Sequence, residues 1–167
     1  LTGGLGGLGL RAAAMLVEAG ACVLLASRSG RVAQSEQCFK GQVCLVASTA
    51  VLVCDGADCC DTSSLVAARS LVGVLHAAGV LRDRMLRAMS ADDVGASFAP
   101  KAAAAAHMHK TTGAQYLFES CGLFSSVAST FGNVGQANYA GANAYLDALA
   151  LRDRRGGMLV SSLQIPV

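Results

Sequence analysis

The strongest constraint on the fold is the glycine-rich segment at residues 1–9, which reads Leu-Thr-Gly-Gly-Leu-Gly-Gly-Leu-Gly. Glycine has no β carbon, so this segment can turn tightly and let other groups approach its backbone. Helical spacing of apolar residues follows over 10–19, and Gly20 is a typical helix stop. The apolar run at 21–26 then indicates a buried strand. A glycine turn, a helix and a buried strand in this order favour a parallel α/β sheet.

The rest of the chain continues the alternation of apolar strands and helices. Apolar runs predict further strands at 43–47, 51–54, 71–76, 121–126 and 158–163. Helices are predicted at 85–108, with a break near Pro100, and at 139–155, and a weak one between 30 and 41. Strands that are apolar throughout need helices over both faces. We therefore predict a doubly wound parallel sheet with three αβα layers.

Composition limits both the size of the fold and its partners. A chain of 167 residues with 53% hydrophobic content can bury one core, so we expect one domain. Only 14% of residues are charged and the net charge is +2, which argues against a nucleic-acid surface or a polybasic membrane anchor. The seven cysteines are an odd number and favour reduced thiols and a cytoplasmic setting, with an organelle left open. No ligand pair complements Cys59 and Cys60, so no metal is expected.

The glycine-rich segment also suggests a ligand. Gly3, Gly7 and Gly9 would let a helix N-terminus approach a pyrophosphate, although a plain flexible turn remains an alternative. Ser27-Arg28 follows the next strand, where an acidic residue would usually bind the ribose hydroxyl of NAD. A cation there can pair with a 2'-phosphate. This pattern favours NADPH over NADH, and a plain surface charge at Arg28 is the alternative.

Ser126, Tyr139 and Asn143 have the pattern of a carbonyl reductase. A hydride added to a ketone leaves an alkoxide, and a phenol held near a hydroxyl group can protonate it. Tyr139 and Asn143 are four residues apart, so they share one face of the predicted helix, while Ser126 ends a predicted strand. The alternatives are an aromatic ring packed on the sheet and a hydroxyl that caps the backbone. Ser125 is the neighbour most easily mistaken for Ser126.

Together these motifs are similar to the ketoreductase domains of modular, type I polyketide synthases, within the short-chain dehydrogenase/reductase superfamily. The resemblance implies a Rossmann-like doubly wound sheet. It also implies that residues 1–167 are a single NADP-binding catalytic domain, a fragment whose first strand and C-terminal lid are largely missing. The motifs that carry it are Thr2-Gly3 through Gly9, Ser27-Arg28, Cys54-Asp55, His76-Ala77-Ala78-Gly79, Pro100-Lys101, Phe124-Ser125-Ser126 and Gly135-Gln136-Ala137-Asn138-Tyr139.

The resemblance also implies the catalytic roles. Ordinary short-chain reductases place a lysine four residues after the tyrosine, but position 143 is asparagine and no lysine follows Lys110. Polyketide ketoreductases exchange lysine and asparagine between two helices, so Lys101 becomes the candidate and Lys110 the alternative. The Lys101 ammonium group would make the Tyr139 phenol a better acid. Ser126 would bind the substrate carbonyl, Tyr139 would protonate the alkoxide, and Asn143 would position Lys101 or a relay water.

For the cofactor, the resemblance assigns Asp55 to the adenine amino group and residues 77–79 to the adenosine and the nicotinamide ribose. Asp55 could instead cap a turn, and with Asp58 and Asp61 it superficially suggests a calcium loop, although the terminal glutamate is missing. His76, His107 and His109 receive no catalytic role. The expected cofactor residues are Thr2, Gly3, Gly4, Leu5, Gly6, Gly7, Leu8, Ser27, Arg28, Asp55, His76, Ala77, Ala78 and Gly79.

The function that the resemblance implies is NADPH-dependent reduction of a 3-oxoacyl thioester to the 3-hydroxyacyl thioester in polyketide or fatty-acid biosynthesis. The partners would be an acyl carrier protein with a phosphopantetheine-linked substrate and neighbouring synthase domains, with no nucleic acid or membrane. Two alternatives are a stand-alone short-chain ketone reductase and a non-catalytic dinucleotide-binding or scaffold module.

Three segments depart from the family pattern. Family members that make the D-hydroxy product usually have Leu-Asp-Asp where this chain has Leu81-Arg82-Asp83, so only the second aspartate is kept. Members of the opposite stereochemical type have tryptophan where this chain has Phe131, so the D-hydroxy product is favoured. Gln164-Ile165-Pro166 stands where the family has a tryptophan-glycine pair.

Overall fold

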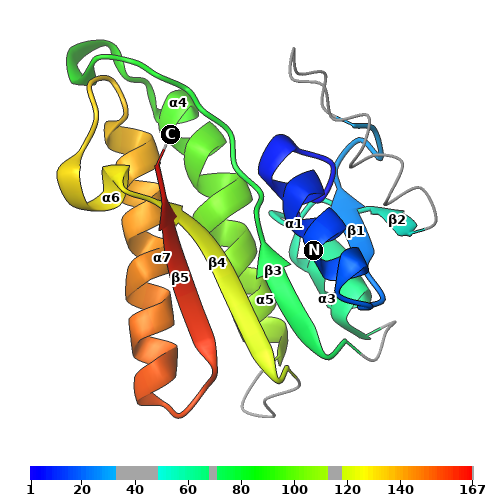
Figure 1. Ribbon diagram of the computed structural model, residues 1–167. Coiled ribbons are helices and arrows are strands. Elements are labelled where there is room, and N and C mark those ends of the chain that lie inside the picture. Colours follow the sequence, from blue (N-terminus) through cyan, green and yellow to red (C-terminus); the bar gives the residue numbers. More distant parts are fainter. Residues whose placement is uncertain (33–48, 68–70, 113–117, 167) are drawn as a thin grey trace.

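The computed structural model describes residues 1–32, 49–67, 71–112 and 118–166, and its strands form a parallel sheet (Figure 1). One part pairs β1 (Leu24–Ser27) with β2 (Ala50–Val53). The other part has the order β3-β4-β5. Its strands are β3 (Gly73–His76), β4 (Ser120–Ser126) and β5 (Val160–Ile165).

Thr2 joins the two parts of the sheet. It forms parallel bridges with Ala26 at the end of β1 and with His76 at the end of β3. The Thr2 amide donates a hydrogen bond to the Leu75 carbonyl at 3.0 Å, and the Ala26 amide donates to the Leu1 carbonyl at 2.8 Å. The glycine-rich segment therefore leaves the middle of the sheet at the carboxyl ends of its strands, where ligands bind in open α/β sheets.

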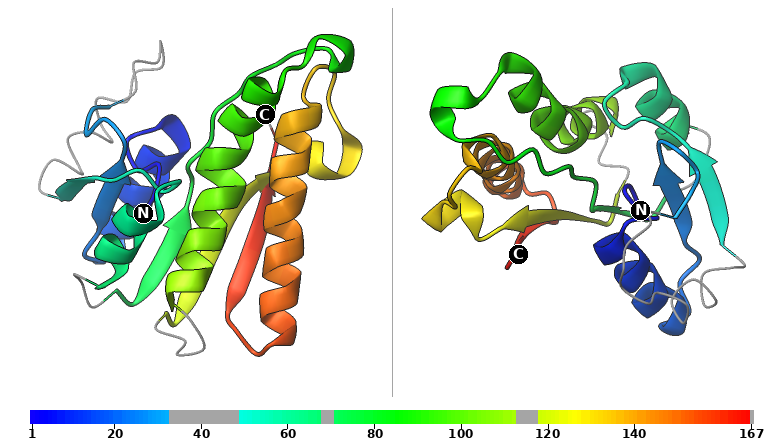
Figure 2. Two further views of the ribbon diagram at one scale, coloured as in Figure 1. Left: turned by 180° about the vertical axis from the view of Figure 1, so that it is seen from behind. Right: turned by 90° about the horizontal axis from the view of Figure 1, so that it is seen from above.

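Helices cover both faces of the sheet, which confirms the predicted doubly wound architecture. Figure 2 shows α1 (Gly7–Glu18) on one face, and α3 (Cys59–Ala67), α5 (Ala104–Thr112) and α7 (Ala137–Arg155) on the other. Successive residues of a strand point to opposite faces. Accordingly, Leu25 packs in a cluster with α1, and Ala26 packs with Leu65 of α3.

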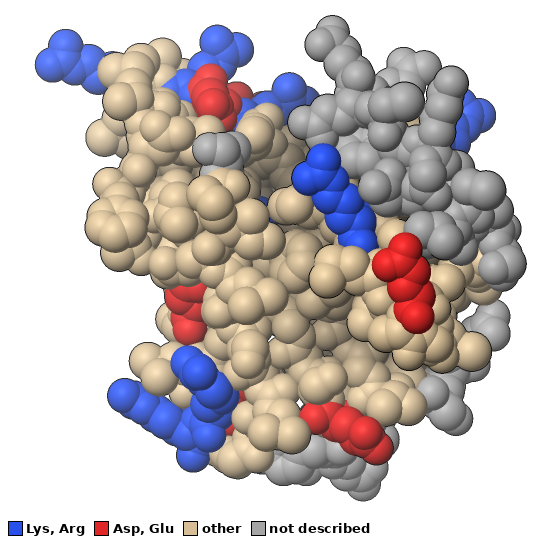
Figure 3. Space-filling view, viewed as in Figure 1, with Lys and Arg blue, Asp and Glu red and all other residues tan. Residues whose placement is uncertain are grey.

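The largest core cluster lies between β4 and β5 on one side and α5 and α7 on the other. Its seven buried residues are Ala105, Met108, Leu123, Leu146, Leu149, Ala150 and Val160. Charged side chains on the face in Figure 3 are scattered over a mainly uncharged surface. No helix among the described residues is long and apolar enough to span a bilayer.

Several helices differ from the sequence prediction: the helix predicted from residue 85 begins at Ala91, and the short helix at Ala128–Phe131 was not predicted. Helix α1 begins at Gly7, inside the glycine-rich segment, rather than at residue 10. Helix α3 was not expected, because its aspartates resembled a loop. Asp58 in fact caps this helix, since its Oδ1 atom accepts hydrogen bonds from the Cys60 and Asp61 amides at 2.8 and 3.0 Å. The predicted strand at 43–47 and most of the weak helix at 30–41 lie outside the described residues.

The predicted break near Pro100 is a π-helical turn, η2 (Ala99–Ala103). It joins α4 (Ala91–Phe98) directly to α5, so this part of the chain bends without leaving the helix. Two short elements, η1 (Leu86–Ala88) and α6 (Ala128–Phe131), complete the fold. The π turn matters for the site because it contains Lys101.

Candidate active site

The glycine-rich segment is packed too tightly for side chains. Gly3 has φ +66, and a β carbon at this position would lie 2.5 Å from the backbone nitrogen of Ala78. A β carbon at Gly9 would collide with the Gly3 carbonyl. Gly6 is the N-cap of α1, and no side chain caps that helix. The first amides of α1 are therefore available to a phosphate, and the segment fits the pyrophosphate of a dinucleotide.

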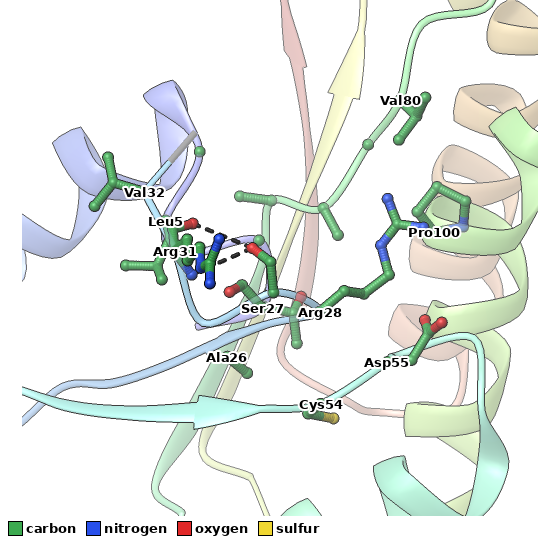
Figure 4. A pocket seen from close by; sticks show the side chains of 17 residues that line it. Leu5, Ala26, Ser27, Arg28, Arg31, Val32, Cys54, Asp55, Val80 and Pro100 are labelled. Carbon is green, nitrogen blue, oxygen red and sulfur yellow. Dashed lines mark hydrogen bonds between the residues drawn. The ribbon is translucent and has the colours of Figure 1, made fainter. Parts of the chain in front are cut away.

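A cavity of about 500 Å³ opens beside this segment, at the carboxyl ends of β1 and β3. Figure 4 shows the Arg28 side chain crossing it from the end of β1 toward Pro100, while Arg31 lies beside Ser27. The Ser27 hydroxyl accepts a hydrogen bond from the Gly30 amide at 3.1 Å, which shapes the loop that carries both arginines. Two guanidinium groups on one short loop can hold a phosphate monoester.

Most of the cofactor residues expected from the sequence line this cavity. They are Thr2, Gly3, Leu5, Gly6, Ser27, Arg28, Asp55, Ala77, Ala78 and Gly79. Gly4 and His76 are buried and line neither this cavity nor the one beside Tyr139. Sequence analysis missed Arg31, although a second arginine three residues after Arg28 was a usable signal. Val80 and Pro100 were also missed, because only the folded chain brings their segments to the cavity.

A second cavity of about 430 Å³ holds the expected acid. It is lined by Lys101 and Tyr139, together with Gly7 and Leu8 of the glycine-rich segment. The two cavities adjoin, since both are lined by Gly6, Ala77, Gly79 and Val80. A dinucleotide held in the first cavity could therefore extend to the second.

Lys101 is nearly buried, with 4% of its surface exposed. Its ammonium group donates a hydrogen bond to the Phe124 carbonyl at 2.8 Å and lies 5.3 Å from the centre of the Tyr139 ring. Burial lowers the pKa of Lys101 to about 8, and the negative charge of Asp147 opposes that change. Lys110, the alternative cation, is exposed near the end of α5 and lines neither cavity.

Ser126 and Asn143 are both fully buried and line neither cavity. The Ser126 oxygen accepts a hydrogen bond from the Ala128 amide at 3.1 Å, which leaves its own proton for another acceptor. The Asn143 side-chain amide donates to the Tyr139 carbonyl at 2.8 Å, while its Oδ1 atom is buried without a partner among the described residues. Ser125 lines the cavity, and its hydroxyl donates to the Asn143 carbonyl at 3.3 Å.

His76 connects the glycine-rich segment to the π turn. Its Nδ1 atom lies 2.6 Å from the Thr2 hydroxyl, and its Nε2 atom lies 3.1 Å from the Lys101 carbonyl. Because a carbonyl only accepts, Nε2 carries the proton and Nδ1 accepts from Thr2. Burial lowers the pKa of His76 to about 4, so the ring is neutral. This imidazole supports the backbone of Lys101.

The segment after residue 80 is tied to the start of α7. Asp83 accepts a hydrogen bond from the Gln136 side chain at 3.0 Å, and the Arg84 amide donates to the Gly135 carbonyl at 2.8 Å. Phe131, the last residue of α6, is 84% exposed. The described residues contain no group of three or more potential metal ligands.

The sequence of this chain is similar to those of known proteins. The family model for the KR domain matches residues 1–167. A spectinabilin polyketide synthase system protein, NorB of Streptomyces orinoci, is 37% identical over 171 residues, covering 98% of this chain and 8% of that protein. Polyketide synthase GfsA of Streptomyces halstedii is 44% identical over 123 residues, covering 71% of this chain and 2% of that protein. The chain thus spans less than a tenth of the length of either relative.

Solved structures give the same picture. The first ketoreductase of the tylosin polyketide synthase matches with a TM-score of 0.84 and 34% identity, covering 98% of this chain and 36% of that one. A structure of A-type ketoreductases from a modular polyketide synthase matches with a TM-score of 0.84 and 37% identity, with the same coverage.

Proposed function

The chain belongs to the KR domain family, the ketoreductases of polyketide synthases within the short-chain dehydrogenase/reductase superfamily, and from this premise we propose its reaction. Residues 1–167 form the catalytic part of a domain that reduces a 3-oxoacyl thioester to the 3-hydroxyacyl thioester with NADPH. The observation that carries this proposal is the Lys101 ammonium group, 5.3 Å from the Tyr139 ring in a cavity that adjoins the glycine-rich one.

A nicotinamide dinucleotide is the cofactor type of this superfamily, and we propose NADPH in particular. The amides at the start of α1 would hold the pyrophosphate. Arg28 and Arg31 would hold the 2'-phosphate, since both line the cavity and residues 27–32 contain no acid. When bound, NADPH supplies the hydride.

The chain's own residues would stabilise and protonate the oxyanion that forms on the substrate. Tyr139 donates its phenolic proton to the substrate oxygen. The Ser126 hydroxyl, which is fully buried and lines neither cavity, would donate a hydrogen bond to that oxygen only after a movement at the end of β4 uncovers it. The Lys101 ammonium group stabilises the phenolate that Tyr139 becomes. The unpartnered Oδ1 atom of Asn143 is a ready acceptor for a relay water or for Lys101.

The proposed substrate is attached through phosphopantetheine to an acyl carrier protein. The relatives support this setting, because they are polyketide synthase proteins far longer than this chain. Other synthase domains would then be neighbours in the same polypeptide. A non-catalytic scaffold would not require a buried lysine beside a tyrosine, since burying an ammonium group is costly.

Tyr139→Phe tests the function in the complete polypeptide that contains these residues. We expect turnover of a 3-oxoacyl thioester to fall at least about a hundredfold, because the acid is lost. NADPH affinity, followed by cofactor fluorescence, should stay within about twofold, a range worth about 0.4 kcal/mol. If the Tyr139→Phe variant retains native turnover, Tyr139 is not the acid.

A further inference from the structure

Asp147 gathers hydrogen bonds from two other elements of the fold. On α7 it follows Tyr139 and Asn143 at intervals of four residues, so the three share one helix face. Its carboxylate accepts hydrogen bonds from the Ser129 hydroxyl at 2.6 Å, from the Gln164 side chain at 2.9 Å and from the Ser162 hydroxyl. Ser129 lies on α6, and Ser162 and Gln164 lie on β5.

These contacts reach the catalytic serine through one intermediate residue. The Ser129 hydroxyl lies 2.8 Å from the Ser126 carbonyl and 2.6 Å from Asp147, so its single proton is shared between these two acceptors. Gln164 also donates to the Ser129 oxygen, at 3.0 Å. The end of β4 is thereby fixed relative to α7.

The same carboxylate acts on Lys101 by its charge. Burial opposes ionisation of Asp147, but hydrogen bonds from Ser129, Ser162 and Gln164 outweigh it and lower the pKa of the carboxyl group. Asp147 is therefore an anion at neutral pH. No described ion pair joins it to Lys101 within 4.0 Å, so its effect is a field and not a contact.

Among the described residues, the other groups that contact Lys101 carry no negative charge. Tyr139 faces it from α7, and the neutral His76 ring reaches its backbone from β3. On β4, Lys101 meets the Phe124 carbonyl, which is uncharged. Asp147 is the anion that opposes the effect of burial on the Lys101 pKa.

We propose that Asp147 is a positioning residue of the ketoreductase site: its carboxylate holds Ser129 and, through Ser129, the Ser126 backbone against α7. This inference rests on the proposed function. The negative charge of the same carboxylate supports this role, because it favours the ammonium form of Lys101.

Asp147→Asn removes the charge and turns one of the two acceptor oxygens into an amide donor, so part of the hydrogen-bond network from Ser129, Ser162 and Gln164 is lost as well. At neutral pH we expect kcat to fall about tenfold, as expected from 1.4 kcal/mol. The high-pH limb of kcat/KM should move to lower pH by about half to one unit, because a field from beyond contact distance no longer favours the ammonium form. NADPH affinity should remain native, since Asp147 lines neither cavity.

Ser162→Ala is the matched control. It removes one hydrogen bond to the carboxylate and retains the charge, so kcat should fall modestly while the pH limb stays in place. Glu18→Gln removes an exposed carboxylate at the end of α1 and should change neither quantity. If Asp147→Asn lowers kcat but leaves the limb unmoved, the charge does not act on Lys101 and the proposal is wrong. An inactive native protein, or an active Tyr139→Phe variant, would instead contradict the proposed function.

Discussion

Gly3→Ala should disrupt the close packing between the glycine-rich segment and the backbone of Ala77 and Ala78, which follow β3. With φ +66, Gly3 occupies the left-handed region, which costs an L residue about 1–2 kcal/mol. The new β carbon would lie 2.5 Å from Ala78 N, 2.6 Å from Ala78 Cα and 2.7 Å from Ala77 C. All three are backbone atoms, so no side-chain rotation relieves the contact.

The required displacement can be worked out from these distances. Ordinary contact begins at 3.4 Å, so the two segments must separate by about 0.9 Å, the difference from 2.5 Å. The hydrogen bond from the Ala77 amide to the Thr2 carbonyl, now 3.0 Å, would stretch beyond bonding range. Its loss adds about 1 kcal/mol, which gives a total of about 2–3 kcal/mol for the variant.

NADPH titration by cofactor fluorescence and thermal unfolding measure the two consequences. We expect the Kd to rise at least about tenfold, the equivalent of 1.4 kcal/mol, and the Tm to fall. Gly95→Ala is the control, because Gly95 lies in α4 with no atom within 4 Å of the added β carbon. Alanine there should bind NADPH normally and stabilise the helix slightly. Native affinity and native Tm in Gly3→Ala would refute the steric argument.

Two further predictions concern charge. The folded state lowers the pKa of Lys101 from 10.5 to about 8, so the folded protein releases this proton first. Folding stability should therefore rise by about 3 kcal/mol as pH increases from about 8 to 10.5, as measured in denaturant titrations that compare the native protein with Lys101→Met. Turnover should fall over the same range, because the ammonium form is lost; a flat pH profile would contradict the role of Lys101. Arg28→Ala should weaken NADPH binding about tenfold or more and leave NADH binding nearly unchanged, and an equal loss for both would place the 2'-phosphate elsewhere.

Local signals predicted most of the fold. Residues 121–126 and 139–155 lie within β4 and α7 as predicted, and the strand predicted at 71–76 is present from Gly73 onward. Helix α3 was missed because Asp58 is equally suited to a loop and to a helix cap, and only the path of the chain decides between them.

The site was predictable to the extent that motifs name residues. Lys101 and Tyr139 do share a cavity, as the motif resemblance implied. The burial of Ser126 and the bridging position of His76 could not be predicted, because both depend on residues far away in the sequence. Asp147 had a weak signal in its spacing from Tyr139, but its partners on β5 follow it by 15 and 17 residues.

The His76 bridge has a thermodynamic consequence for ligand binding. The rigid His76 imidazole contacts Thr2 of the glycine-rich segment at one end and the Lys101 carbonyl at the other, so a displacement at one end is transmitted to the other. If a bound dinucleotide orders the π turn and so raises the affinity for the thioester, a bound thioester raises the affinity for the dinucleotide by the same factor. Coupling between two binding sites is reciprocal. The two ligands should then bind cooperatively.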